Sequence, residues 1–139
     1  MKAPEITPEA FTELVNQTMH VGADFRFRVL ELEWGRARVH LEGSETFQRP
    51  GGTISGPTLF TLADLTLWAA VLSCIGFEPL AVTSDLTLHF LRRPPLGALE
   101  AEARILKCGR RLVHGDVRIA SPGRDEAPVC HASGTYARS

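Results

Sequence analysis

The chain has 139 residues and three cysteines, enough for one domain with a hydrophobic core but no disulfide framework. A formal net charge of −1 and a hydrophobic fraction of 44% give no basic excess of the kind that nucleic-acid binding requires. The first residues are acids and prolines rather than an apolar signal peptide, and Asp64 interrupts the longest apolar stretch. We therefore expect a single cytoplasmic domain, residues 1–139, with no nucleic-acid or membrane partner.

The first third of the chain predicts one short helix and two strands. Thr7 and Pro8 are typical of the cap and first residue of an amphipathic helix, which is expected to end within 20–22. Apolar residues then alternate with charged or polar ones over 25–29 and again over 37–41. Because alternation with a period of two indicates a strand with one buried face, we expect two antiparallel strands here.

The central stretch, 49–74, contains the best helix candidate. A loop rich in proline and glycine precedes an apolar run that predicts a long helix ending near Gly76. The run leaves no wide polar face, which indicates a helix enclosed on nearly all sides. Asp64 lies in its middle, and a carboxylate is costly to bury unless hydrogen-bond donors meet it. Asp64 is therefore a candidate functional residue.

The remaining chain predicts strands only. We expect four strands that form a meander. In the first of these strands, Thr83, Asp85 and His89 are expected on one face, and Val82 and Leu86 on the other face. The alternating segments are 80–91, 99–105, 113–119 and 129–136.

This order of elements predicts an α+β architecture. One antiparallel sheet has to cover the enclosed helix, and the helix is the natural element for it to wrap around. The helix is apolar all round, and the polar face of the strand over 80–91 carries little charge. A second copy packed alongside would cover both the open side of the helix and this strand face, so we expect a homodimer or homotetramer.

Three segments carry a resemblance to a known family: 58–64 with its L-A-D, 82–94, which ends within the motif FLRRPP, and 107–112. Together with the order of elements, they resemble the hotdog-fold acyl-CoA thioesterases, in particular the phenylacetic-acid-pathway thioesterases. The resemblance implies the hotdog fold, an antiparallel sheet wrapped around one long central helix. It also implies hydrolysis of an acyl-CoA thioester to free acid and coenzyme A, with coenzyme A as part of the substrate and no separate cofactor or metal.

The resemblance assigns catalytic roles to three residues. Asp64 matches the helix carboxylate that activates water or attacks the thioester, and Gly56 matches the backbone amide that polarises its carbonyl. Thr83 matches a hydroxyl, from the neighbouring subunit, that holds the water. The resemblance, together with the departures from it, also implies a set of residues that bind substrate. Among them, the cations beyond residue 90 would contact the nucleotide and phosphates of coenzyme A. These candidates are Arg49, Ser55, Thr58, Ser84, Arg92, Arg93, Lys107, Arg110 and Arg111.

The chain departs from the family pattern just before the helix. Ser55-Gly56-Pro57 stands where the family usually has His-Gly-Gly, and Arg49 stands where it often has Asn. Pro57 has no amide hydrogen, so Gly56 and residues beyond Pro57 remain as donors, while Ser55 can cap the helix. Arg49 can bind an acyl group that carries a carboxylate, or it can neutralise Asp64 and leave the site inactive.

Two other functions stay open at this point. The departures at Arg49, Ser55 and Pro57 favour an acyl-CoA binding or sensing module without turnover. A hotdog hydratase or dehydratase ranks last, because that chemistry usually pairs a histidine with an acid and no histidine lies near the glycine loop. The surroundings of Ser55 do not fit a G-x-S-x-G nucleophile, and the scattered histidines predict no metal site.

Overall fold

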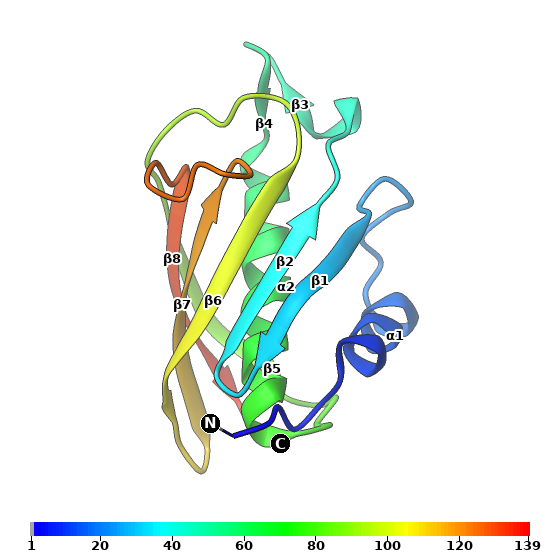
Figure 1. Ribbon diagram of the computed structural model, residues 1–139, viewed down its shortest axis with the longest axis vertical. Helices are drawn as coiled ribbons and strands as arrows, with labels where there is room; N and C mark the ends of the chain where they lie inside the picture. The colour runs from blue at the N-terminus through cyan, green and yellow to red at the C-terminus, as the bar shows by residue number, and fades with distance from the viewer. Residues whose placement is uncertain (1) are drawn as a thin grey trace.

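The computed structural model describes residues 2–139 and contains one long helix inside a curved sheet (Figure 1). The two predicted helices and six predicted strands are confirmed. A short 3-10 helix and a two-stranded hairpin occur where the sequence indicated only a loop. The elements are α1 Pro8–Thr18, β1 Phe27–Glu33, β2 Arg36–Leu41, η1 Glu45–Phe47, β3 Gln48–Arg49, β4 Thr53–Ile54, α2 Gly56–Ile75, β5 Val82–Phe90, β6 Leu99–Cys108, β7 Leu112–Ala120 and β8 Cys130–Ala137.

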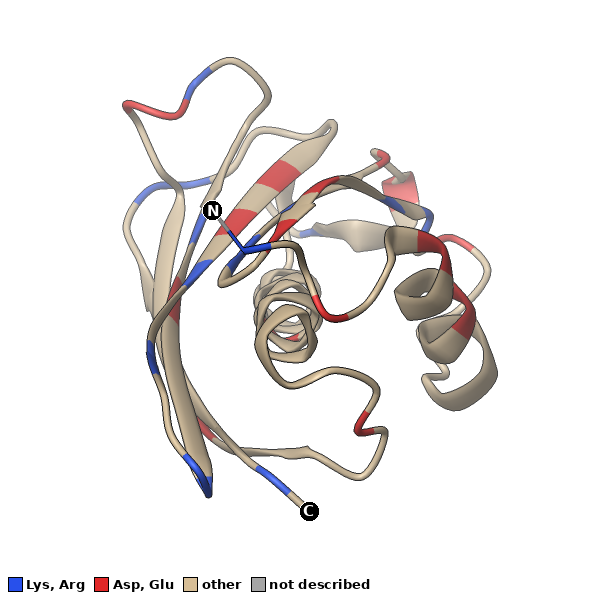
Figure 2. Ribbon diagram, turned by 60° about the horizontal axis from the view of Figure 1, so that its bottom comes forward, with Lys and Arg blue, Asp and Glu red and all other residues tan. Residues whose placement is uncertain are grey.

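The main sheet has six antiparallel strands in the order β1-β2-β6-β7-β8-β5. It curves around α2, and many of the acidic and basic residues lie on the sheet strands and loops around the helix (Figure 2). Strands β3 and β4 form a separate hairpin next to the N-terminal end of α2. The architecture confirms the expected hotdog fold, an α+β arrangement with an antiparallel sheet wrapped around one central helix.

The expected meander of four strands is wrong for β5. Strands β6, β7 and β8 do follow one another across the sheet, but β5 pairs with β8 at the far edge and not with β6. The segment 91–98 carries the chain from this edge back to the interior of the sheet, where β6 pairs with β2. Alternation indicates which face of a strand is buried, but it does not determine which strand lies beside it.

Helix α2 begins and ends where the local sequence predicts. Ser55 is its N-cap, with a side-chain oxygen that accepts a hydrogen bond from the amide of Thr58, and Pro57 lies in the first turn. The helix stops before Gly76, whose φ of 83° lies in the region that glycine adopts without strain. Helix α1 is likewise capped by Thr7, but it ends at Thr18, short of the predicted 20–22.

The expectation that α2 is enclosed on nearly all sides holds only for its C-terminal two thirds. From Leu65 to Ser73 every residue is buried, whereas in the first turns Pro57 is exposed and Phe60 is 44% exposed. Asp64 lies at the boundary and is half-buried. Although α2 is long and apolar enough to cross a membrane, it forms the core of the domain. The sheet covers only one side of α2, so one strip of its N-terminal half stays open.

Two glycines allow α2 to approach the sheet closely. Gly115 and Gly134 are paired neighbours on β7 and β8. A Cβ atom on Gly134 would lie 2.9 Å from the carbonyl oxygen of Asp85 and 2.9 Å from the side chain of Leu67 on α2. Contacts this short force backbone or helix to shift, so the glycines set the spacing between the helix and the sheet.

We expect Gly134→Ala to lower the free energy of unfolding by about 1–3 kcal/mol, the usual cost of overpacking. Urea unfolding followed by circular dichroism measures the change. Ser133→Ala, at the exposed neighbouring position, is the matched control and is expected to shift the value by less than about 0.5 kcal/mol. Equal stability of Gly134→Ala and the wild type would contradict the close approach.

Candidate active site

Asp64 is held through one of its two carboxylate oxygens. The hydroxyl of Thr83 donates to Oδ1 at 2.8 Å, and the hydroxyl of Tyr136 donates to the same oxygen at 2.6 Å. Oδ2 accepts no hydrogen bond from any of residues 2–139. The carboxylate therefore has a defined orientation and one free oxygen, which can accept a proton from water or attack an electrophilic carbon.

A β-bulge brings Thr83 to this site. The pairing of β5 with β8 shifts register between Thr83 and Asp85, which leaves Ser84 as an extra residue. The bulge turns Thr83 toward α2, so the prediction that Thr83 shares a face with Asp85 and His89 is wrong. The contact with Asp64 forms within one chain, and Thr83 needs no neighbouring subunit to reach it. Ser84, a predicted binding residue, is exposed in the bulge.

Tyr136 is the residue that sequence reasoning missed. It lies on β8 opposite Thr83, is only 3% exposed, and its hydroxyl also lies 3.2 Å from the carbonyl oxygen of Asp64. Burial, followed by the negative charge of Asp64, raises the pKa of Tyr136 far above its usual value. The hydroxyl therefore stays protonated and donates. Although it is the only tyrosine in the chain, no motif links it to Asp64, 72 residues earlier.

The start of α2 presents a second polar group. The Thr58 amide donates to the Ser55 hydroxyl oxygen at 3.4 Å, and the hydroxyls of the two residues share a hydrogen bond of 2.8 Å. These bonds confirm Ser55 as the predicted cap of α2. Gly56 is the first helical residue, and its N–H makes no hydrogen bond to another of the described residues. An amide at this position points outward and carries the partial positive charge of the helix N-terminus, so it can stabilise an oxyanion.

One chain does not bring Gly56 and Asp64 to the same point. Eight residues of helix separate them, and a rise of about 1.5 Å per residue places them about 12 Å apart along the axis. A single thioester carbonyl cannot contact both at hydrogen-bond distance. Of the three predicted catalytic residues, the structure therefore unites Asp64 with Thr83 and leaves Gly56 apart.

The predicted cationic residues fall into two groups. Arg49, Arg92 and Arg93 line a cavity of about 460 Å³ beside Gly56. Arg49 makes no ion pair with Asp64 within the described chain, so the structure of one chain does not support neutralisation of that carboxylate. Three more cations lie at the β6–β7 hairpin, at the opposite end of the molecule from the β3–β4 hairpin (Figure 1). They are Lys107, Arg110 and Arg111.

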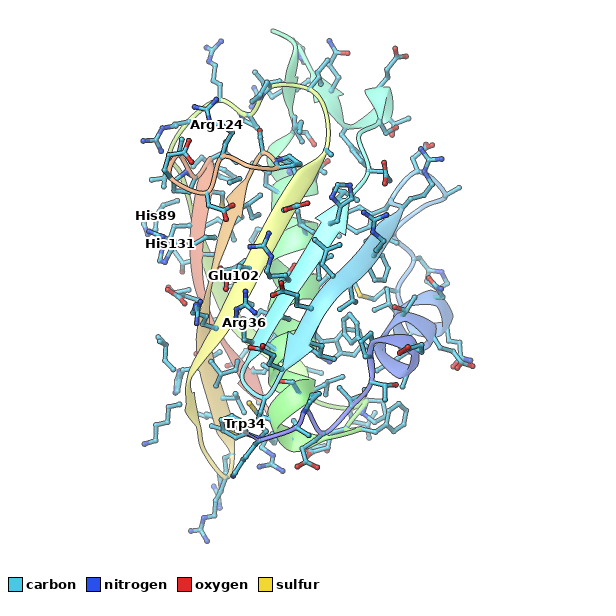
Figure 3. All side chains as sticks on the ribbon, in the orientation of Figure 1. Trp34, Arg36, His89, Glu102, Arg124 and His131 are labelled. Carbon is cyan, nitrogen blue, oxygen red and sulfur yellow. The ribbon has the colours of Figure 1, made fainter. Side chains whose placement is uncertain are left out.

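Other polar groups lie away from Asp64 or lack reactivity. Arg36 and Glu102 form an ion pair on the outer face of the sheet, and His89 and His131 are paired on β5 and β8 (Figure 3). Burial raises the pKa of the Cys74 and Cys130 thiols to about 11, which keeps both protonated at neutral pH. Within residues 2–139 no group of three or more His, Cys, Asp or Glu side chains is placed to hold a metal ion.

The profile of the Thioesterase superfamily matches residues 51–127, more than half of the chain and the part that contains α2, β5 and most of the residues that line the cavity beside Gly56. The chain therefore belongs to the Thioesterase superfamily.

Solved and curated relatives agree with this assignment. A candidate thioesterase of Silicibacter sp. TM1040 is 36% identical, with a TM-score of 0.84 over 98% of this chain and 94% of that chain. The phenylacetic acid degradation protein PaaI of Thermus thermophilus, in a mutant structure, is 28% identical, with a TM-score of 0.73 over 83% of this chain and 95% of that one. A candidate esterase of Saccharolobus solfataricus is 28% identical over 84% of this chain and 79% of its own length.

Proposed function

We propose that this protein hydrolyses an acyl-CoA thioester to a free acid and coenzyme A, with Asp64 as the reacting carboxylate. The observation that carries the proposal is the orientation of Asp64, whose Oδ1 is held by Thr83 and Tyr136 while Oδ2 is free. In one route, Oδ2 takes a proton from water as the water oxygen attacks the thioester carbon. The carbon–sulfur bond then breaks and the coenzyme A thiolate takes up the proton. In the other, Oδ2 attacks the thioester carbon and the carbon–sulfur bond breaks to release the coenzyme A thiolate. Water then hydrolyses the resulting anhydride to the free acid and the Asp64 carboxylate, and the thiolate takes up a proton from that water.

The amide of Gly56 is the proposed oxyanion donor, and it acts in a site shared between two copies. Because Gly56 and Asp64 of one chain lie about 12 Å apart along α2, the amide of one copy has to meet the carboxylate of another. This makes a homodimer a requirement of the mechanism and not only a matter of stability.

Strand β5 is the proposed dimer contact. It lies at the edge of the sheet, pairs only with β8 among the described strands, and leaves its other edge open. A long open edge beside apolar side chains is a favourable place for a second copy to add its own β5. The exposed apolar residues on or near β5 and the open strip of α2 are Phe60, Phe77, Leu80, Val82, Phe90 and Leu91.

Such a dimer also brings the two separated groups of cations together at one end of the assembly. Antiparallel pairing of two β5 strands turns the second copy end over end. The β6–β7 hairpin of that copy, with Lys107, Arg110 and Arg111, then lies at the same end of the dimer as Arg92 and Arg93 of the first. Together they are proposed to meet the nucleotide and phosphates of coenzyme A.

Release of the coenzyme A thiol from a panel of short, long and aromatic acyl-CoAs tests the function. Hydrolysis of at least one of them, dependent on Asp64, is expected. The second candidate, an acyl-CoA binding or sensing module, is favoured by one observation. Arg49 stands where the family often has Asn and makes no ion pair with any of residues 2–139. Tight binding of an acyl-CoA without thiol release from any of the panel would support that module and contradict the enzyme.

Tyr136 is proposed to position Asp64. Tyr136→Phe removes one of two donors to Oδ1, and we expect kcat to fall on the order of tenfold with KM nearly unchanged, because a hydrogen bond to a charged group is lost. Steady-state kinetics on the best panel substrate measure both constants. Thr66→Val is the matched control, since it removes a buried hydroxyl on α2 whose one hydrogen bond among residues 2–139 is to the Leu62 carbonyl. A rise in KM at constant kcat, or an equal fall in the control, would contradict the positioning role.

A further inference from the structure

The cavity beside Gly56 combines an apolar wall with a cationic rim. The lining includes the apolar residues Leu59 of α2 and Phe90 at the end of β5. Its cationic residues are Arg49, Arg92 and Arg93. The volume of about 460 Å³ is sufficient for a small organic group. A site of this composition suits a ligand that has an anionic group at the end of a short apolar chain.

The positive charge at the cavity has no acidic partner among residues 2–139. Arg92 donates to the carbonyl oxygen of Pro128 at 2.7 Å, whereas Arg49 and Arg93 make no ion pair or side-chain hydrogen bond with any of residues 2–139. None of the described residues that line the cavity is acidic. A guanidinium group presents a planar pair of N–H donors that matches the two oxygens of a carboxylate.

The β3–β4 hairpin holds Arg49 close to the proposed oxyanion donor. Arg49 on β3 pairs with Thr53 on β4, and the amide of Ser55 donates to the carbonyl oxygen of Phe47 at 2.7 Å. The hairpin is thus tied to the cap of α2, one residue before Gly56. Arg49 and Gly56 line the same cavity, so one bound group can contact both residues.

We propose that this cavity binds the distal carboxylate of a dicarboxylic acyl group and that Arg49 is the residue that selects it. The proposal rests on the function proposed above, in which the Gly56 amide holds the thioester carbonyl. A carboxylate a few carbons from that carbonyl can stay in the same cavity. The phosphates of coenzyme A lie at the far end of the pantetheine arm, so they reach away from the Gly56 amide and toward Lys107, Arg110 and Arg111 of the second copy.

Two matched substrates test the selection. Glutaryl-CoA carries a distal carboxylate, and 5-methylhexanoyl-CoA carries an isopropyl group of similar shape in its place. For Arg49→Gln we expect kcat/KM to fall at least about tenfold with glutaryl-CoA and to change less than about twofold with 5-methylhexanoyl-CoA. Arg26→Gln, at an exposed arginine outside the cavity, is the control and is expected to leave both values unchanged. An equal effect of Arg49→Gln on the two substrates overturns the proposal.

Pantetheine thioesters distinguish an acyl carboxylate from the phosphates. If Arg49 binds the carboxylate, the loss in Arg49→Gln persists with glutaryl-pantetheine, which has no phosphate. If the loss disappears with this substrate, Arg49 binds coenzyme A phosphates and the proposal is overturned.

Binding separates failure of this proposal from failure of the proposed function. If the wild type hydrolyses no thioester, calorimetry with the non-hydrolysable 4-carboxybutyl thioether of coenzyme A, in which a methylene group replaces the glutaryl thioester carbonyl, takes the place of kinetics. Arg49→Gln is expected to weaken binding of this thioether at least about tenfold and to leave binding of the 5-methylhexyl thioether unchanged, which would support the carboxylate site without turnover. Equal binding of the two thioethers by the wild type overturns it.

Discussion

Asp64→Asn is expected to reduce kcat for acyl-CoA hydrolysis by a factor of about 10² to 10⁴, the usual contribution of a positioned base. The asparagine oxygen can still accept the hydrogen bonds that Thr83 and Tyr136 donate to Oδ1. The amide nitrogen that replaces Oδ2 can neither take a proton from water nor attack a carbonyl. The fold should therefore persist while the chemistry is lost, and a thiol-release assay with a thermal melt measures both.

Asp24→Asn is the matched control for this experiment. Asp24 is an exposed carboxylate just before β1, at the edge of the sheet opposite β5. Its loss is expected to change kcat less than about twofold, as is usual for surface substitutions away from a site. Near wild-type turnover in Asp64→Asn would mean that another group performs the chemistry.

Gly56→Pro is expected to lower kcat by about 10² to 10³, because it removes the N–H that is proposed to stabilise the oxyanion. Proline is tolerated in the first turn of a helix, so α2 should still form. Gly56→Ala retains the amide, and its Cβ would lie 3.6 Å from the Phe90 ring, an ordinary contact. The alanine variant should therefore lose much less activity than the proline variant. Equal losses would show that space at residue 56, and not the amide, limits turnover.

Mixed dimers test whether two copies share the site. If Gly56 of one copy acts with Asp64 of the other, a dimer of one Asp64→Asn chain and one Gly56→Pro chain keeps one intact site. Mixing the two inactive variants is then expected to restore about a quarter of wild-type activity, since half of the dimers are mixed and each has one working site of two. Native mass spectrometry measures the mixed fraction. Mixed dimers without activity would contradict the shared site.

Much of the local structure, and the carboxylate at the centre of the candidate site, could be predicted from sequence. Periodicity predicted the strands, and Ser55 and Gly76 marked the ends of α2 because caps act within a few residues. Asp64 stood out because an ionisable group in an apolar helix demands an explanation. The resemblance then indicated Gly56 and Thr83 as its partners.

The tertiary structure alone decided how these groups meet. The place of β5 beside β8, and the bulge at Ser84 that turns Thr83 toward α2, depend on strand register, which is set by packing across the whole sheet. Tyr136 reaches Asp64 through that register, with 72 residues of chain between them. The sequence by itself determined which residues form the helix and strands, because those signals are local. The second donor to the carboxylate and the distance from Gly56 to Asp64 follow from long-range pairing and helix geometry.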